Sequence, residues 1–277
     1  MWPPILAVFL ALGLFSSTPQ AVAGEGLELW VHPYLPATAL IKRFSPLTAF
    51  LSEQLGMPVA IRIQKSYRDQ IDFVGQDQAD IAYLGPVSYL KIHDDFGPKP
   101  LLARLKVDGK PFFHGMIIVQ QDSPIRQLSD LVGKKFAFGD PNSTMSHVVP
   151  RAHLKKAGIP LDLLGDYEFL GSHHDVALGV LGGYFDAGGV KEEVFYEYQA
   201  RGLRMLAQSP PISEHVFVTR ANLAPELVAR LRQAFMAVNE DPRQAEILTA
   251  IKKTVTGFAP VTDRDYDELR ELMKFAE

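Results

Sequence analysis

The order of apolar segments along the chain limits its fold more than any other feature. Between residues 27 and 84, three short apolar segments (27–31, 59–63 and 80–84) alternate with two segments of helical spacing. This β-α-β-α-β order predicts a parallel sheet with helices on its faces. Ligands of such sheets bind beyond the carboxyl ends of the strands. Here those ends are His32-Pro33, Ser66-Tyr67 and Leu84-Gly85-Pro86.

A second α/β alternation begins near residue 129. It contains predicted strands at 134–138, 167–170 and 187–190, with helices at 143–156, 175–181 and 192–201. The segments near 108–116 and 207–216 connect the two halves. Two sheets joined by two crossings describe a bilobed clamshell, with residues 24–112 and 214–277 in lobe 1 and residues 113–213 in lobe 2. We expect the strand-end loops of both lobes to meet in the cleft between them.

Four of the helices predicted for the first lobe have bounds that the sequence indicates. In the first of them, Ser45 is a natural N-cap and Pro46 a natural first helical residue, with apolar side chains at helical spacing as far as Leu55. The others are expected at 225–239, at 242–253 and from Asp263 to the end of the chain.

The segment Phe136–Ser146 has the form of an anion-binding turn. An alternating apolar strand breaks at Gly139-Asp140-Pro141-Asn142 and restarts as a helix that Ser143 or Thr144 can cap. The unpaired N–H groups of such a helix start, its dipole and the two hydroxyls favour a bound anion. Capping of the helix alone is the alternative interpretation of the same residues.

Composition restricts the class of protein further. The chain has 277 residues, 47% of them apolar and 22% charged, with a net charge of -4 and no cysteine. These values are typical of a soluble protein, and they argue against a nucleic-acid partner, a disulfide, a thiolate metal site and a lipoprotein anchor. Adjacent histidines point in different directions, so His173 and His174 are not expected to chelate one metal. We expect neither metal nor cofactor.

The first 23 residues resemble an export signal. Residues 5–15 are apolar, and the segment ends in Ala21-Val22-Ala23, the small-x-small pattern of a signal-peptidase site. The segment has no Lys or Arg, so an uncleaved anchor is the alternative, although the apolar run is short for a membrane span. We expect a periplasmic protein that begins near Gly24.

Several ordered motifs make the chain resemble a known family. They are residues 139–144 with Pro150, residues 80–86 with Ser88-Tyr89, and residues 171–173 with Val180 and residues 186–188. Between about Leu29 and Glu246 the chain is similar to the periplasmic substrate-binding proteins of phosphonate, phosphite and phosphate ABC importers. The resemblance implies an α/β fold of the type II periplasmic-binding-protein class, with two parallel or mixed sheets, flanking helices and two crossover strands.

The same resemblance implies an anion site. Members of the family grip the anion with a Ser-Thr-Ser triplet, which corresponds here to Ser143, Thr144 and Met145, so the third hydroxyl is missing. Ser146 follows where the family usually has glycine. The family's histidine corresponds to His173, and its tyrosine from the other lobe corresponds to Tyr67.

The resemblance also implies contacts with the rest of the ligand. Phe113 and His114 correspond to a wall on the first crossing. Members that bind an aminoalkyl phosphonate hold its ammonium group with two carboxylates, of which Glu193 corresponds to the first and His215 replaces the second. The resemblance therefore favours phosphate, phosphite or a simple alkylphosphonate over an aminoalkyl ligand.

Lobe closure is the mechanism we expect. Tyr67 and the Leu84-Gly85-Pro86 loop would close over an anion at Ser143, and the closed protein, a monomer, would meet an ABC permease. A membrane sensor kinase is an alternative partner. A heterocyclic vitamin precursor stacked on Tyr34, Tyr67, Tyr83 and Phe113 is an alternative ligand. A hydrolase using Ser143 or Thr144 is disfavoured because the G-x-S-x-G elbow is absent.

Overall fold

The first lobe is built around a mixed six-stranded sheet. A computed structural model of the protein describes residues 26–276, and the predicted signal segment lies outside them. The strand order is β13-β4-β12-β3-β1-β2. Strand β1 is parallel to β2 and β3, as the alternation predicts, whereas β3, β12, β4 and β13 are successively antiparallel. The strands are β1 (Leu27–Val31), β2 (Val59–Ile63), β3 (Ile81–Leu84), β4 (Leu101–Val107), β12 (Val216–Thr219) and β13 (Val255–Ala259).

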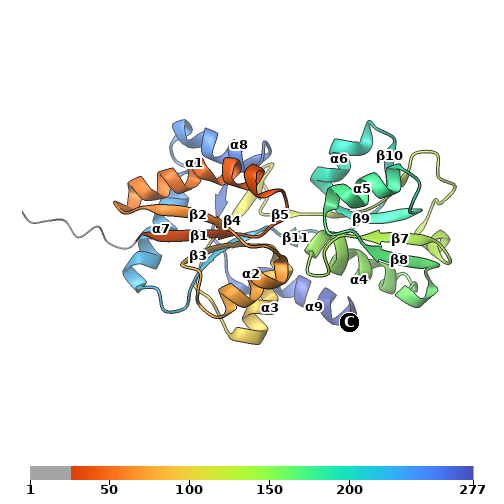
Figure 1. Ribbon diagram of the computed structural model, residues 1–277, viewed down its shortest axis with the longest axis horizontal. Helices are drawn as coiled ribbons and strands as arrows, with labels where there is room; N and C mark the ends of the chain where they lie inside the picture. Colours follow the sequence, from red (N-terminus) through yellow and green to blue (C-terminus); the bar gives the residue numbers. More distant parts are fainter. Residues whose placement is uncertain (1–25, 277) are drawn as a thin grey trace, which may run out of the picture.

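Helices cover both faces of this sheet (Figure 1). One core contains side chains of α1, α7 and α8 packed on the sheet, and another contains side chains of α2 and α3 packed on its other face. Their bounds are α1 (Ala37–Leu55), α2 (Tyr67–Gly75), α3 (Pro86–Phe96), α7 (Pro225–Ala237) and α8 (Ala245–Ile251).

The second lobe is a five-stranded sheet of order β10-β6-β9-β7-β8. Strand β7 is parallel to β8 and β9, and β6 is antiparallel to β9 and β10. The elements are β6 (Gly115–Gln120), β7 (Lys135–Phe138), β8 (Asp166–Phe169), β9 (Ala187–Lys191), β10 (Leu203–Gln208), α4 (Val149–Lys156), α5 (His173–Leu181) and α6 (Glu192–Gln199).

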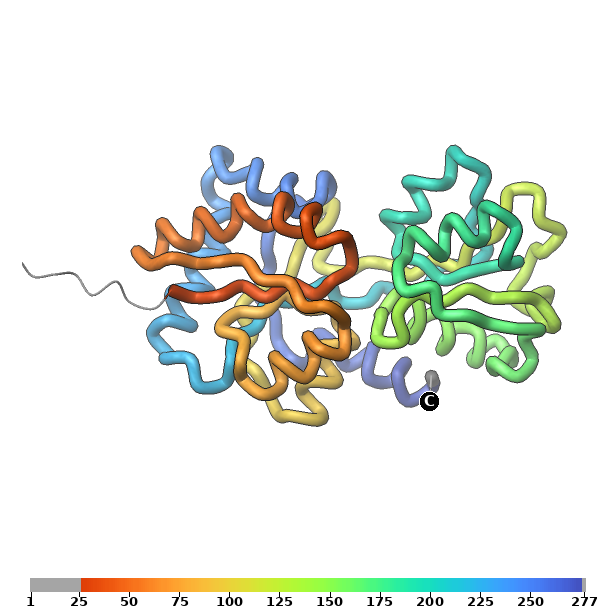
Figure 2. Tube along the Cα trace, in the orientation of Figure 1, coloured from red at the N-terminus to blue at the C-terminus, as the bar shows by residue number. Residues whose placement is uncertain are grey.

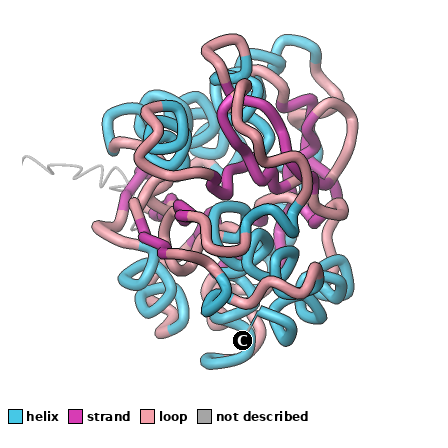
Figure 3. The backbone as a smooth tube through the Cα atoms, turned by 90° about the vertical axis from the view of Figure 1, so that its right-hand side faces the viewer, coloured by secondary structure: helices cyan, strands magenta, loops and turns pink. Residues whose placement is uncertain are grey.

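Strand β6 shows why this sheet is covered on both faces. Met116 and Ile118 pack with the core under α5 and α6, while Ile117 and Val119 pack with the core under α4. Successive side chains of a strand point to opposite faces, so a continuous apolar run needs helices on both sides. Figure 3 shows this lobe end-on, with helices on either side of its strands.

Two short strands carry the chain between the lobes. Strand β5 (Phe112–Phe113) pairs antiparallel with β11 (Ile212–Ser213), with Phe113 opposite Ile212. Figure 2 shows these two connections running side by side between the lobes. The predicted bilobed fold with two crossings is confirmed.

The C-terminal helix α9 (Asp267–Ala276) also links the lobes. It contacts α4, and Leu269 and Leu272 share one apolar core with Met145 and Val149 of the second lobe. The division of the chain at residues 112–113 and 213–214 stays a prediction, and α9 is the part of residues 214–277 that packs on lobe 2.

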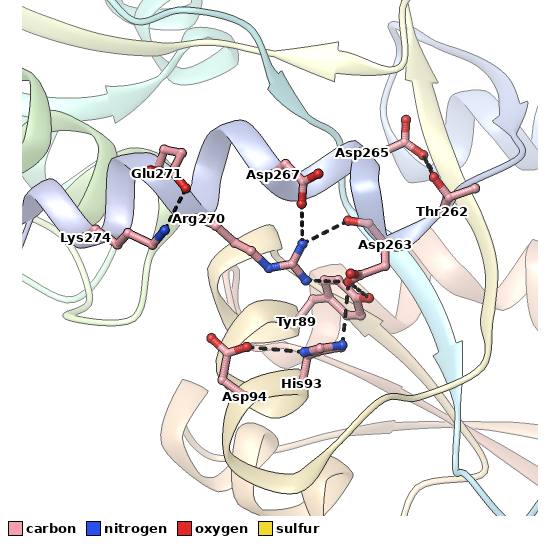
Figure 4. A network of polar contacts seen from close by, with 10 residues as sticks. All are labelled: Tyr89, His93, Asp94, Thr262, Asp263, Asp265, Asp267, Arg270, Glu271 and Lys274. Atoms are coloured by element: carbon pink, nitrogen blue, oxygen red, sulfur yellow. Dashed lines mark hydrogen bonds and ion pairs between the residues drawn. The ribbon is translucent and has the colours of Figure 1, made fainter.

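A polar network fixes the start of α9 on α3 (Figure 4). The Tyr89 hydroxyl donates to Asp263 Oδ1 at 2.7 Å, and Arg270 bonds to the same oxygen and to Asp267 Oδ1 at 2.7 Å. Burial alone raises the pKa of Asp263, but the hydrogen bonds from Arg270 and Tyr89 outweigh it and lower the pKa. The carboxylate is thereby kept ionised between the two helices.

The structure corrects three predictions of secondary structure. Helix α1 begins at Ala37, so Pro46 lies inside it, and the Ser45 hydroxyl donates to Ile41 O at 2.6 Å instead of capping a start. The helix predicted at 143–156 is a π-helical turn, Thr144–Val148, followed by α4. Residues 255–259, between the last two predicted helices, form the edge strand β13. Within the described residues, no helix is long and apolar enough to cross a membrane.

Candidate functional site

A small cavity lies where the strand ends of the two lobes meet. We call it the anion cavity; about 20 Å³ of it is open to the centre of a water-sized molecule. The first lobe contributes residues that follow β1 and β3 or precede β12, and the second lobe contributes residues that follow β7 and end β9. The lining residues are His32, Tyr34, Tyr67, Gly85, Phe113, Ser143, Thr144, Met145, His173, Lys191 and His215.

Ser143 and His173 form the polar floor of the anion cavity. The Lys191 backbone N–H donates to His173 Nδ1 at 3.1 Å, which places the imidazole proton on Nε2. His173 Nε2 then donates to Ser143 Oγ at 3.3 Å, and the Ser146 N–H donates to the same oxygen at 3.2 Å. Because Ser143 Oγ already accepts two hydrogen bonds, its own proton is available to a ligand.

Burial controls the charge of His173. The side chain is enclosed and stands near Lys191, and both effects lower the pKa of His173 well below its usual value. The imidazole is therefore neutral near pH 7 and acts as an N–H donor. His173 lies at the start of α5, after the end of β8. This position agrees with the rule that ligands bind beyond the carboxyl ends of the strands.

Thr144 joins the two lobes. Its Oγ1 accepts a hydrogen bond at 3.0 Å from the backbone N–H of Val87, in the first turn of α3. Helix α3 has Gly85 at its N-cap and no side-chain cap of its own, so the cap comes from the other lobe. A Cβ built on Gly85 would lie 3.7 Å from Thr144 Oγ1. This is an ordinary van der Waals distance, so the approach of the two lobes does not depend on glycine at this position.

Lys191 supplies the formal positive charge of the anion cavity. Its Nζ lies 2.8 Å from Glu193 Oε2 and 4.9 Å from the ring centroid of Tyr34. The side chain is only 13% exposed. An ammonium held this way attracts an anion more strongly than an exposed lysine would, because water screens it less.

A stack of rings closes the side of the cavity that belongs to the first lobe. The His32 ring stacks on Tyr83 and on His215, each at a centroid distance of 5.3 Å. His32 Nδ1 donates to Tyr83 O at 3.2 Å, and burial, with His215 nearby, lowers the pKa of His32 well below its usual value. His32 therefore presents a neutral ring. Tyr67 contacts the edge of this ring at 5.3 Å, and burial raises the pKa of its hydroxyl, which stays protonated.

The structure places the residues predicted to bind ligand in two groups. Those that line the anion cavity are Tyr67, Gly85, Phe113, Ser143, Thr144, Met145, His173 and His215. Leu84, His114, Ser146 and Glu193 lie outside it. Leu84 is fully buried in the core, and His114 Nδ1 bonds to Ser209 O at 2.9 Å.

Ser146 and Glu193 lie just beyond the cavity. The Ser146 hydroxyl donates to Gly189 O at 2.5 Å, inside the second lobe, so Met145 rather than Ser146 presents its side chain to the cavity. Glu193 lines a neighbouring cavity and reaches the anion cavity only through Lys191.

Three lining residues are absent from the predicted site: His32, Tyr34 and Lys191. His32 follows β1, whose carboxyl end is expected to face the cleft, and Tyr34 is expected only as a surface on which a ring could stack. Lys191 was missed, although it ends β9 two residues before Glu193 and so meets the strand-end rule. Within the part of the chain that the structure describes, no group of His, Asp and Glu is arranged to hold a metal.

Two sheets, two crossings and a polar cavity between them define a bilobed solute-binding protein. A family model described as "ABC transporter, phosphonate, periplasmic substrate-binding protein" matches residues 29–266. The chain belongs to this family of extracytoplasmic transport proteins. The resemblance seen in the sequence is thus confirmed.

Individual relatives agree with this assignment. The chain is 26% identical to the phosphate-import protein PhnD of Mycolicibacterium smegmatis, over 93% of this chain and 89% of that one. It is 25% identical to the phosphonates-binding periplasmic protein of Escherichia coli, over 85% and 72%. Its fold resembles PhnD1 from Prochlorococcus marinus in complex with methylphosphonate, with a TM-score of 0.80, 19% identity, and coverage of 90% and 97%.

Proposed function

We propose that the protein captures a small phosphorus oxyanion in the anion cavity and delivers it to an ABC importer. The observation that carries the proposal is the convergence of unlike donors on one enclosed space: the hydroxyls of Ser143 and Thr144, the Nε2–H of His173 and the ammonium of Lys191. Hydrogen bonds to a charged ligand contribute roughly 1.5–3 kcal/mol each, enough for tight binding when several act together.

Charge and size together favour a compact anion. The only formally charged side chain that lines the cavity is that of Lys191, a cation, and no carboxylate of the described residues faces it. The cavity leaves only about 20 Å³ for the centre of a water-sized molecule, so it suits a compact ligand. A stacked heterocycle would require the Tyr34, His32 and His215 rings to separate.

The names of the relatives support phosphorus as the central atom. They include a phosphate-import protein, a phosphonates-binding protein and a protein crystallised with methylphosphonate. We therefore propose phosphate, phosphite or an alkylphosphonate as the ligand. The proposed role is binding without chemistry, with no catalytic residue.

Closure of the lobes links binding to delivery. Thr144 caps α3 across the cleft, Lys91 Nζ donates to Asn142 Oδ1 at 2.6 Å, and Met145 packs in a core shared by both lobes. These contacts stabilise a closed form whose joined surface we propose a membrane permease recognises. We also propose that residues 1–23 direct export and that the mature protein is a monomer without a lipid anchor.

A thermal-shift panel tests this function. The protein from Gly24 onward would be heated with phosphate, phosphite, methylphosphonate, 2-aminoethylphosphonate, sulfate and thiamine. A ligand far above its dissociation constant adds roughly 3–4 kcal/mol to the free energy of unfolding. We expect a rise in melting temperature with at least one phosphorus oxyanion in wild type and a clearly smaller rise in Ser143→Ala.

Thr48→Val is the matched control in this panel. The Thr48 hydroxyl donates to Ser45 O, within α1 and away from the anion cavity, so this variant should keep the wild-type response. A response to thiamine but to no phosphorus oxyanion would refute the proposed ligand class.

A further inference from the structure

A second cavity lies beside the anion cavity and, unlike it, has acidic as well as basic side chains in its lining. We call it the carboxylate cavity, because the acidic side chains of Glu193 and Glu214 line it. Its free space is also about 20 Å³. Four residues line both cavities and so form the wall between them: Tyr34, Phe113, Lys191 and His215.

Both acidic groups of the carboxylate cavity are ionised. Burial alone raises the pKa of Glu193, but the charges of Lys191, Lys252 and Arg43 outweigh it and bring the pKa to about 2. Glu214 is also buried, which by itself raises its pKa, but hydrogen bonds from His215 to Oε2 produce a net lowering. Two negative charges therefore lie directly behind the wall of the anion cavity, together with the positive charges of Arg43 and Lys252, which line the same cavity.

Lys191 is the formally charged member of that wall. Its ammonium bonds to Glu193 at 2.8 Å and contacts the ring of Tyr34, while its backbone N–H sets the tautomer of His173. The other cations near Glu193 are farther away, with Lys252 Nζ at 3.7 Å and Arg43 Nη1 at 3.9 Å, and neither lines the anion cavity. Lys191 alone of these cations faces both an incoming anion and Glu193.

We propose that Lys191 is a specificity-determining residue, a built-in cation that selects small oxyanions without an amine. It places a positive charge beside the anion and occupies the position next to Glu193 that the amine of a longer ligand would need. The ammonium group of an amine-bearing anion would lie close to the Lys191 ammonium and would be repelled by it. The carboxylates of Glu193 and Glu214 already have Lys191 and His215 as partners. This inference rests on the proposed function and names the ligand class within it.

Two substitutions separate the charge of Lys191 from its bulk. In Lys191→Met the unbranched side chain keeps the wall filled but loses the ammonium. In Lys191→Ala the wall opens, and the anion cavity joins the carboxylate cavity. Titration calorimetry would measure the dissociation constants of phosphite, methylphosphonate and 2-aminoethylphosphonate for wild type and both variants, after ligand-free melting curves have shown that each is folded.

We expect both variants to bind phosphite and methylphosphonate at least tenfold more weakly than wild type. In Lys191→Ala, the affinity for 2-aminoethylphosphonate relative to methylphosphonate should rise at least tenfold, because the amine can now reach Glu193. Lys155→Ala removes an exposed lysine at the far end of α4 and is the control for loss of charge. It should change no dissociation constant more than twofold.

The outcomes distinguish this inference from the function on which it rests. Failure of wild type to bind any phosphorus oxyanion would overturn both. Two other outcomes would overturn only the role of Lys191, provided that wild type binds. One is an unchanged affinity of Lys191→Met for phosphite and methylphosphonate. The other is an unchanged ratio of the affinities for 2-aminoethylphosphonate and methylphosphonate in folded Lys191→Ala. If Lys191→Ala does not fold, the Met variant alone decides.

Discussion

Replacement of Thr144 by valine should open the clamshell without damaging either lobe. Valine has the shape of threonine but no oxygen, so the Val87 N–H at the start of α3 loses the acceptor that lies 3.0 Å away. This N–H is buried only when the lobes are closed. In the open form water can replace the lost acceptor, and the cost therefore falls on the closed form.

The size of the effect follows from the cap. Loss of an N-cap acceptor costs about 0.5–2 kcal/mol, and a buried unpaired N–H costs about 1–3 kcal/mol. A cost of about 1–2 kcal/mol lowers the ratio of closed to open protein by a factor of about 5–30. Ligand affinity should fall by up to this factor through the smaller closed population, and further because the Thr144 hydroxyl is also a proposed donor to the anion.

Distance measurements between the lobes can detect this change directly. The chain has no cysteine, so labels can be attached through Glu53→Cys on α1 and Glu168→Cys on β8, both exposed positions. Energy transfer in the ligand-free protein should show a lower closed population in Thr144→Val, with recovery in Thr144→Ser. Thr48→Val should match wild type. An unchanged closed population in Thr144→Val would refute the claim that the cap holds the lobes together.

Three further predictions concern pH, the C-terminal helix and the anion-binding turn. His32 and His173 are buried, and their pKa is lowered in the folded protein, so the unfolded chain binds more protons below pH 6.5. As the pH drops below 6.5, the free energy of unfolding should therefore fall by up to about 1.4 kcal/mol per pH unit for each histidine. Urea titrations that give equal free energies of unfolding at pH 7.5 and 5.5 would contradict this prediction. Asp263→Ala removes a partly exposed carboxylate that joins α3 to α9. The free energy of unfolding should fall by about 1 kcal/mol and the melting temperature by about 2–4 °C. A calorimetric scan with no shift in melting temperature would argue against the network. Gly139→Ala would bring a Cβ within 2.5 Å of Ser146 Oγ and displace the turn. Titration calorimetry should then find an anion affinity at least tenfold lower, and urea titration should find a free energy of unfolding lower by about 1–3 kcal/mol. Wild-type affinity in this variant would show that the turn tolerates the shift.

The fold could be predicted well because most of it follows from the periodicity of apolar residues. Apolar strands and helical spacing alternate twice, and turn residues separate them, which is enough to define two lobes and their order. The start of α1 was misplaced because Ser45-Pro46 satisfies the local rule for a helix start, although the tertiary structure continues the helix on both sides of Pro46. Strand β13 was missed because five residues interrupted by Gly257 give little periodic signal.

The candidate site was predicted in part, for a different reason. Ser143, Thr144 and His173 lie at strand ends and helix starts, where sequence alone predicts exposed donors. The role of Lys191 depends on its distance to Glu193 and on the wall it shares between two cavities, and no local pattern encodes these. The Thr144–Val87 bond likewise joins residues 57 positions apart.

Calorimetric titration of wild type and Ser143→Ala with phosphite, phosphate and methylphosphonate tests the central claim most directly. Ser143 Oγ accepts from both His173 and the Ser146 N–H, so its own proton is the donor that this substitution removes. We predict saturable binding of at least one of these anions to wild type, with one ligand per chain, and at least a tenfold loss of affinity in Ser143→Ala. The account would be contradicted if folded wild type showed no heat of binding with any of these anions. It would also be contradicted if wild type and Ser143→Ala had equal affinity.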